Sequence, residues 1–205
     1  MTLSNNVFPN VSRETSDRLE VYEDLLKKWN PAINLVSKLS LNDLRNRHFI
    51  DSMQVFDLKS DSSKTWVDIG SGGGFPGLVC AIMAADAAPQ IEFHLVESDI
   101  RKATFLRNVA REVGIKISVH SERIEKLNCF NADILSARAL ASLEKLLEFA
   151  VLHLSSGGVA LFPKGVSFKE EIETARLEWK FDVIEYQSQT DENSVVLKVG
   201  NIARV

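Results

Sequence analysis

The sequence predicts an α/β fold with a mostly parallel sheet, a helical N-terminal extension and a C-terminal antiparallel hairpin. From residue 65 onward, short apolar runs alternate with segments of helical periodicity, which is typical of parallel sheets with helices on both faces. The last two strand-like runs are joined by the polar loop 188–193, which is too short for a helical crossover, so they should be antiparallel. A glycine-rich turn after the first strand marks the place where such folds bind nucleotide-like ligands.

The helical extension comes first in the chain. Apolar residues in Arg13–Trp29 recur with the spacing of an amphipathic helix, and Leu41–Phe56 continues in the same way. The polar segment Leu58–Lys64 indicates an exposed linker. We therefore expect a helical extension packed on the core over residues 1–60 and an α/β domain over residues 61–205.

The α/β domain then alternates strands and helices in order. The clearest helix ends at Gly114 and carries an apolar stripe at three- and four-residue spacing. The predicted strands are Thr65–Ile69, Ile91–Val96, Ile117–His120, Ala132–Ala137, Val159–Phe162, Asp182–Gln187 and Ser194–Val199. The predicted helices are Phe75–Ala85, Ile100–Val113, Leu143–Leu154 and Phe168–Lys180, with a turn at Ser155–Gly158 and Pro163-Lys164-Gly165 closing the fifth strand.

Composition indicates one cytoplasmic globular protein. The chain has 205 residues, of which 45% are hydrophobic and 25% charged, and no apolar run approaches the roughly 20 residues that cross a bilayer. Residues Met1–Ser12 lack the pattern of a secretory signal. Cys80 and Cys129 lie in apolar surroundings and far apart in sequence, so we expect two buried, reduced thiols rather than a disulfide or a metal site.

Charge argues against a general nucleic-acid binder but leaves room for a local patch. The net charge is −4. The segment 101–126 is nevertheless basic, and it fits either an RNA-facing surface or a solvated helix face. Its basic residues are Arg101, Lys102, Arg107, Arg111, Lys116, Arg123 and Lys126.

The glycine turn at 70–77 allows two interpretations. Gly72, Gly74 and Gly77 formally match the dinucleotide pattern G-x-G-x-x-G. However, Asp68 lies just before the first glycine, where it would crowd a pyrophosphate, and the fold fills the rest of the chain and leaves no separate catalytic domain. Five parallel strands with a terminal hairpin are the arrangement of class I methyltransferases. These observations favour S-adenosylmethionine over NAD as the ligand.

Each candidate cofactor contact has a physical role and an alternative. Gly70, Gly72 and Gly74 let the backbone pass close to a ligand. Asp68 either accepts hydrogen bonds from the ammonium side of the ligand or orders the loop. Glu97 ends the second strand, where a carboxylate can bind both ribose hydroxyls, although it also suits the start of the next helix.

Several segments resemble one bacterial family, the ribosomal RNA small subunit methyltransferase G family, also called glucose-inhibited division protein B. The matching segments occur in the family's order from about residue 20 to 200. They are Trp29–Ser37 (W-N-x-x-x-N-L-x-S), Arg47–Ser52 (R-H-x-x-D-S), Asp68–Gly77 (D-x-G-S-G-x-G-F-P-G), Glu97–Leu106, Ala137-Arg138-Ala139 and Lys164-Gly165. Two departures, Ala137 for the commoner serine and a longer loop at Ala84–Ala88, touch no expected ligand contact.

The resemblance implies methyl transfer from S-adenosylmethionine to N7 of one guanine, at position 527 in the 530 loop of 16S rRNA. It also implies the cofactor contacts Gly70, Phe75, Ile124, Glu125 and Arg138, of which Ile124 and Glu125 would lie over the adenine unless they are plain helix surface. Guanine N7 has a lone pair and no proton, so it is itself the nucleophile, and the protein need supply no general base, nucleophile or metal.

Two cations are the expected catalytic residues, because they follow the fourth and fifth strands, where ligands bind in open α/β sheets. Arg138 would order the site at the cofactor, and Lys164 would grip an RNA phosphate or the guanine edge; a structural ion pair and a solvated lysine are the alternatives. His48 and Asp51 indicate a polar helix-packing cluster rather than an acid–base pair.

The expected partner is 16S rRNA, free or in a small-subunit ribonucleoprotein, bound by a monomer away from any membrane. Two other functions stay open from the sequence. One is a methyltransferase that acts on a small molecule or a protein. The other is a non-catalytic S-adenosylmethionine-binding factor in ribosome assembly, which the intact glycine turn and Glu97 disfavour.

Overall fold

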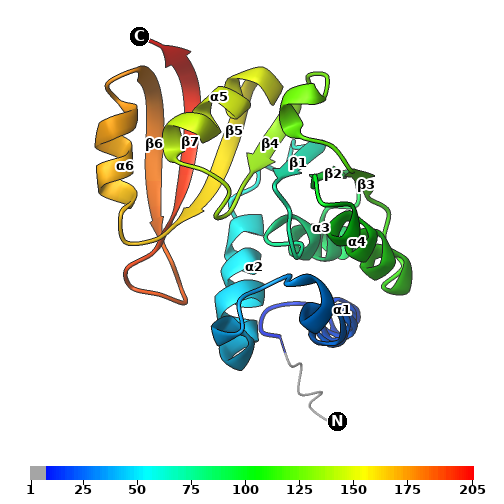
Figure 1. The fold of residues 1–205 in the computed structure, drawn as a ribbon. Helices are drawn as coiled ribbons and strands as arrows, with labels where there is room; N and C mark the ends of the chain where they lie inside the picture. Colours follow the sequence, from blue (N-terminus) through cyan, green and yellow to red (C-terminus); the bar gives the residue numbers. More distant parts are fainter. Residues whose placement is uncertain (1–7) are drawn as a thin grey trace.

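The computed structural model describes residues 8–205, so the expectation about Met1–Ser12 lies partly outside the described residues. It confirms the predicted fold class. A seven-stranded sheet has the order β3-β2-β1-β4-β5-β7-β6, in which β1 to β5 run parallel and β7 pairs antiparallel with both of its neighbours (Figure 1).

The elements follow the predicted alternation closely. The strands are β1 (Thr65–Ile69), β2 (Glu92–Val96), β3 (Ser118–His120), β4 (Ala132–Ser136), β5 (Leu154–Lys164), β6 (Trp179–Gln187) and β7 (Val195–Arg204). The helices are α1 (Arg13–Ile33), α2 (Asp51–Phe56), α3 (Gly77–Ala87), α4 (Ile100–Glu112), α5 (Leu143–His153) and α6 (Phe168–Ala175). Shorter turns are η1 (Leu39–Asp43), η2 (Arg45–Ile50) and η3 (Ile124–Lys126).

Helices cover both faces of the sheet, so the strands are apolar on both sides. Side chains alternate between the faces of a strand: Trp66 belongs to the core cluster shared with α1, α3 and α4, whereas Val67 belongs to the cluster shared with α5 and α6. Both residues are fully buried. This two-sided core fixes the carboxyl ends of β1, β4 and β5 at one edge, where the candidate site lies.

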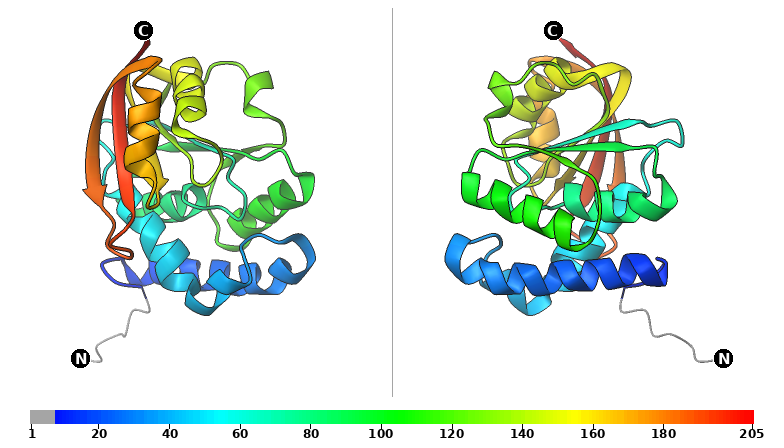
Figure 2. Two further views of the ribbon diagram at one scale, coloured as in Figure 1. Left: turned by 60° about the vertical axis from the view of Figure 1, so that its left-hand side comes forward. Right: turned by 90° about the vertical axis from the view of Figure 1, so that its right-hand side faces the viewer.

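The N-terminal helices form a base beneath α3 and α4 (Figure 2). Leu19, Tyr22 and Leu26 of α1 are fully buried in the same cluster as residues of α3 and α4. At one end, Arg18 pairs with Asp86 at 3.0 Å. The division into an extension over 1–60 and a domain over 61–205 stays a prediction, and the shared cluster is consistent with an extension packed on the core.

Three local expectations are wrong. The predicted helix Phe168–Lys180 ends at Ala175, because the buried Trp179 begins β6 instead. The predicted turn 155–158 lies within β5, where the pairing with β4 shifts register and Gly157 has φ +82°. Cys129 is exposed, whereas Cys80 is buried as expected. Segment 41–56 is helical as predicted, although it consists of 3₁₀, π and α turns in succession.

Candidate active site

The glycine turn connects β1 to α3 and is packed tightly by neighbouring side chains. Gly70 has φ +65°, a conformation that L side chains rarely adopt, and a Cβ there would lie 2.6 Å from Leu140 Cδ1. A Cβ on Gly77 would lie 2.6 Å from Leu95 Cδ2 and would also collide with the Asp68 side chain. The turn therefore requires glycine both for its conformation and for its approach to β1.

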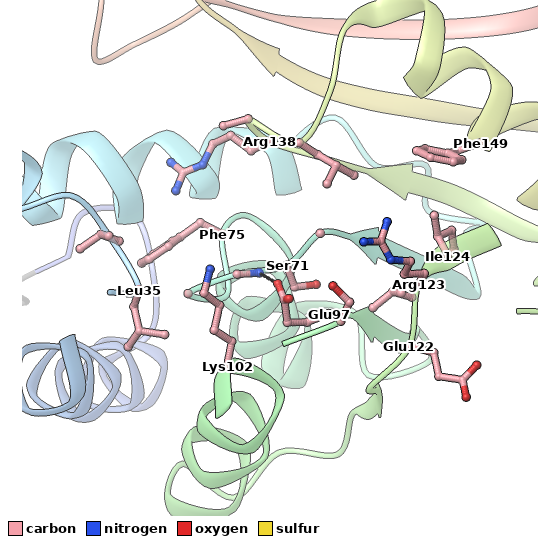
Figure 3. Close-up of a pocket in the computed structure, with 18 of the residues that line it drawn as sticks. Leu35, Ser71, Phe75, Glu97, Lys102, Glu122, Arg123, Ile124, Arg138 and Phe149 are labelled. Atoms are coloured by element: carbon pink, nitrogen blue, oxygen red, sulfur yellow. Dashed lines mark hydrogen bonds between the residues drawn. The ribbon is translucent and has the colours of Figure 1, made fainter. Parts of the chain in front are cut away.

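A cavity of about 570 Å³ opens over this turn, and we call it the glycine-loop cavity. Its size is in the range of small-molecule sites. Figure 3 shows Leu35, Phe75 and Arg138 towards one end, Glu97 in the middle, and Ile124 with Phe149 towards the other. The lining residues are Leu35, Val36, His48, Gly70, Ser71, Gly72, Gly73, Phe75, Val96, Glu97, Ser98, Lys102, Glu122, Arg123, Ile124, Glu125, Arg138, Ala139, Leu140 and Phe149.

Glu97 holds the glycine turn against the end of β2. Its Oε2 accepts a hydrogen bond from the Gly72 N–H at 2.8 Å, and its Oε1 accepts one from the Asp99 N–H at 2.8 Å. The alternative role of Glu97 at the start of the next helix is compatible with its bond to the N–H of Asp99, which is the residue that caps α4 by accepting from the Arg101 N–H at 2.8 Å. Each carboxylate oxygen of Glu97 keeps a second lone pair for a ligand.

Two expected cofactor contacts lie behind the turn rather than in the cavity. Asp68 is fully buried, and its Oδ1 accepts from Ser136 Oγ at 2.6 Å. Burial raises the pKa of Asp68 from 3.8 to about 6, and its Oδ2 has no hydrogen-bond partner among residues 8–205. Gly74 faces Tyr22 and Leu78. The geometry favours the loop-ordering role of Asp68 over direct ligand contact.

The far end of the cavity is apolar above and polar at its rim. Ile124 is 6% exposed and Phe149 is 5% exposed, and both lie in the core cluster that contains α5. Glu125 follows Ile124 in η3 and is exposed. A flat heterocycle would find an apolar surface here with a carboxylate beside it.

Arg138 closes the near end of the cavity and joins three segments. Its guanidinium lies over the Phe75 ring, with Cζ 5.0 Å from the ring centroid. Nη2 donates to His48 Nδ1 at 2.7 Å, and Nη1 donates to the Arg47 carbonyl at 3.1 Å and to Asp51 Oδ2 at 3.5 Å. Burial and the nearby Arg138 and Arg47 lower the pKa of His48 from 6.5 to about 3, so the ring is neutral.

Lys164 lies in a neighbouring cavity of about 510 Å³, which we call the Lys164 cavity. Its Nζ donates to Glu171 Oε2 at 2.6 Å and to the Ala141 carbonyl at 3.1 Å. The two cavities share the wall 138–140, in which Ala139 has φ +53°. The lining residues are Asp51, Arg138, Ala139, Leu140, Ala141, Pro163, Lys164, Gly165, Glu171, Ser194 and Val195.

The structure thus brings most of the predicted site together. Gly70, Gly72, Phe75, Glu97 and Arg138 line the glycine-loop cavity with Ile124 and Glu125, whereas Lys164 lies beyond the shared wall. Sequence reasoning did not identify the Lys164 partner Glu171, and it left His48 in a packing cluster although the ring lines the cavity. The match to the R-H-x-x-D-S motif was the only signal for His48.

Residues 8–205 contain neither a metal site of the usual kind nor a membrane-spanning helix. Within that range, no three His, Cys, Asp or Glu side chains are grouped as ligands for a metal ion. No helix of the described chain combines the length and apolarity that a membrane span requires.

Comparison with known proteins gives one consistent family. The model of the rRNA small subunit methyltransferase G family (GidB) matches residues 15–195. Among curated proteins of that name, the one from Ruegeria pomeroyi is 55% identical over 196 residues, covering 96% of each chain. The one from Rhodospirillum centenum is 50% identical over 193 residues, covering 94% of this chain and 87% of its own.

Solved structures agree on the fold. A TehB-like SAM-dependent methyltransferase from Corynebacterium glutamicum has a TM-score of 0.58 at 13% identity, covering 91% of this chain and 100% of that one. M. jannaschii TYW2 in complex with AdoMet has a TM-score of 0.56 at 11% identity, covering 83% of this chain and 78% of that one. At these identities the likeness concerns the fold alone.

Proposed function

We propose that this chain, which belongs to the rRNA small subunit methyltransferase G family, transfers a methyl group from S-adenosylmethionine to N7 of a guanine in the 530 loop of 16S rRNA. The family match and near-complete coverage of relatives identify an S-adenosylmethionine-dependent rRNA methyltransferase. The main structural support for the proposal is the glycine-loop cavity, because the glycine turn, Glu97 and Arg138 all line it.

The residues of the cavity fit S-adenosylmethionine part by part. Backbone at Gly70 and Gly72 allows close approach, and Glu97 retains lone pairs for ribose hydroxyls. Ile124 with Glu125 would receive the adenine. Arg138 keeps one N–H on Nε and one on Nη2 without partners among the described residues, and this pair suits a carboxylate.

The reaction requires alignment rather than proton transfer. The cofactor supplies an electrophilic methyl group on a positively charged sulfur. Guanine N7 uses its in-plane lone pair to form the new bond to the methyl carbon as the sulfur–carbon bond breaks, so no general base is needed. Positive charge moves from sulfur to the purine, and no proton leaves.

The Lys164 cavity supports a place for the guanine beside the cofactor. It lies at the carboxyl ends of β4 and β5 and contains the carboxylates Asp51 and Glu171. Each carboxylate is paired with a cation, Asp51 with Arg138 and Glu171 with Lys164, so a carboxylate would stabilise the positive purine only where the purine takes the place of that cation. Lys164 is held by Glu171 and would donate to a guanine oxygen or to an RNA phosphate.

We also propose how the RNA is approached. Lys102 and Arg123 line the glycine-loop cavity, while Arg101, Arg107 and Lys126 are exposed nearby in sequence. A basic surface beside the cavity would hold the phosphate backbone. We propose that the substrate is 16S rRNA, free or in a small-subunit ribonucleoprotein, and that the protein acts on it as a monomer in the cytoplasm.

The test is mapping of N7-methylguanine in 16S rRNA from cells with and without this protein. Loss of the modification at one guanine, and its restoration in vitro by purified protein on RNA or on small subunits, is the expected result. Methyl transfer to a protein or to a small molecule instead would show that the proposed RNA substrate is wrong. Absence of transfer to all of these, with the cofactor bound, would favour the non-catalytic assembly factor.

A further inference from the structure

The turn η2, over Arg45–Ile50, is a π-helix that lies against the arginine of the cofactor site. π-Turns are rare and occur often at functional sites. The Asp51 N–H donates to the Asn46 carbonyl, five residues back, as well as to the carbonyls of His48 and Phe49. In an α-helix the Asp51 N–H would bind the Arg47 carbonyl, which here accepts from Arg138 Nη1.

Three groups from η2 and from the residue that follows it therefore bind the guanidinium of Arg138. The Arg47 carbonyl and Asp51 bind Nη1, and His48 Nδ1 binds Nη2. Because Arg138 donates to Nδ1, the neutral ring of His48 carries its proton on Nε2. The Arg138 guanidinium also lies over the Phe75 ring. The hydrogen bonds and this ring contact together fix the orientation of the guanidinium.

This arrangement leaves a defined part of Arg138 for a ligand. Three of the five N–H groups that a guanidinium has are used, and the remaining ones are on Nε and Nη2. These two neighbouring donors form a fork that matches a carboxylate. Arg138 lines the glycine-loop cavity, in which the methionine part of the cofactor would present its carboxylate.

We propose that His48, assisted by Asp51, is a positioning residue that orients the free donor fork of Arg138 towards the cofactor carboxylate. The inference rests on the proposed function, since it needs S-adenosylmethionine in the glycine-loop cavity. It gives the N-terminal extension a part in cofactor binding, separate from any contact with RNA.

The test measures binding of two probes by calorimetry without RNA. S-adenosylhomocysteine contains the amino-acid carboxylate, and 5′-methylthioadenosine lacks it. His48→Ala should weaken S-adenosylhomocysteine binding by about 10- to 100-fold, as expected for a lost hydrogen bond to a charged group. Binding of 5′-methylthioadenosine should be unchanged, which also shows that the variant is folded.

Two conservative variants identify the ring nitrogen. His48→Asn places an oxygen near the Nδ1 position and should restore S-adenosylhomocysteine affinity to within about threefold of wild type, whereas His48→Gln, which mimics Nε2, should not. Asp51→Asn should have a smaller effect than His48→Ala, because its contact to Arg138 is 3.5 Å. His94→Asn, in a histidine pair that does not line the cavity, is the control and should have no effect.

The outcomes separate the two proposals. If wild type does not bind S-adenosylhomocysteine, the cofactor assignment fails. If wild type binds it but His48→Ala does so equally well, or if Gln rescues and Asn does not, the positioning role of His48 is overturned while the proposed function stands. Equal weakening for both probes would also overturn it, since the effect would not involve the carboxylate.

Discussion

The glycine-loop cavity and the Lys164 cavity share the wall 138–140 but are stabilised in different ways. The first is shaped by backbone, with Glu97 bonded to two main-chain N–H groups. The second is shaped by side chains, chiefly the Lys164–Glu171 pair and the Arg138–Asp51 pair. Main-chain geometry tolerates little change, whereas ion-paired side chains can exchange partners when a ligand enters.

This difference suits the two ligands that we propose. S-adenosylmethionine has one fixed shape, and a rigid cavity binds it without reorganisation. A guanine in folded RNA must first leave its surroundings, and a cavity of movable charges can accept it. We therefore expect substitutions behind the glycine turn to affect folding and cofactor binding, and those around Lys164 to affect RNA methylation.

The largest expected effect comes from Gly77, which lies behind the glycine turn at the start of α3. Gly77→Ala should lower the free energy of unfolding by about 3 kcal/mol or more, because its Cβ collides with Asp68 and Leu95, neither of which can move away from β1 or β2. Denaturant unfolding measures the change.

Gly165→Ala is the matched variant in the second cavity. No heavy atom lies within 4 Å of the added Cβ, so the free energy of unfolding should change by no more than about 0.5 kcal/mol. If both glycines tolerate alanine equally, the proposed difference in rigidity is wrong.

The next effect concerns the buried carboxylate behind the glycine turn. Burial raises the pKa of Asp68 from 3.8 to about 6, so the folded state binds a proton more readily than the unfolded state. Protonation of Asp68 therefore stabilises the folded state by about 3 kcal/mol well below pH 3.8, and this stabilisation is lost as the pH rises through about 6.

Asp68→Asn removes this titration and keeps an acceptor for Ser136. The difference in unfolding free energy between the variant and wild type should therefore change by about 2 kcal/mol from pH 4 to pH 7, in favour of the variant at pH 7. A constant difference across this range would mean that Asp68 does not titrate as described.

A smaller effect is expected within the first cavity. Glu97→Ala removes the acceptor that joins the glycine turn to the end of β2, and with it the local acceptor for the Asp99 N–H. S-adenosylmethionine affinity should fall by about 100-fold in calorimetry. Glu122→Ala is the control, because Glu122 lines the same cavity at its exposed rim. Equal losses of S-adenosylmethionine affinity in both variants would mean that the negative charge of the cavity matters rather than the hydrogen bonds of Glu97.

The same contrast explains what the sequence could predict. The strand and helix alternation, the terminal hairpin and the glycine turn depend on local periodicity, and the sequence predicts them in the right order. Some bounds differ, since β5 begins at Leu154 rather than Val159 and β7 ends at Arg204 rather than Val199. The contact of Gly74 with Tyr22, by contrast, joins segments far apart in the chain, and so does the bond from Arg138 to His48. Such pairings depend on tertiary packing, which a single sequence does not record.

Errors in the elements have the same origin. The helix after Lys164 was extended past Ala175 because its charged residues suit a helix, while burial of Trp179 at the sheet edge decides for a strand. Cys129 was expected in the core from its apolar neighbours, but it lies in an exposed loop before β4. The motifs predict which residues belong to the candidate site, but they do not indicate whether each residue lies in the glycine-loop cavity or behind the turn.

The smallest effect that we predict is specific to the second cavity. Lys164→Met removes the cation but keeps the length of the side chain, so kcat/KM for 16S rRNA methylation should fall by about 10-fold while S-adenosylmethionine affinity stays unchanged. Glu171→Gln is the matched variant, since it keeps an acceptor for Lys164 and for the Leu143 N–H.

The two variants separate a substrate contact from an ion pair. If Lys164 contacts the RNA, Glu171→Gln should lower kcat/KM less than Lys164→Met does, and the double variant should match Lys164→Met alone. If both single variants lower stability and leave methylation intact, Lys164 serves only the fold. In that case charge in the second cavity would be structural, and the contrast between a rigid cofactor cavity and an adaptable RNA cavity would have to be abandoned.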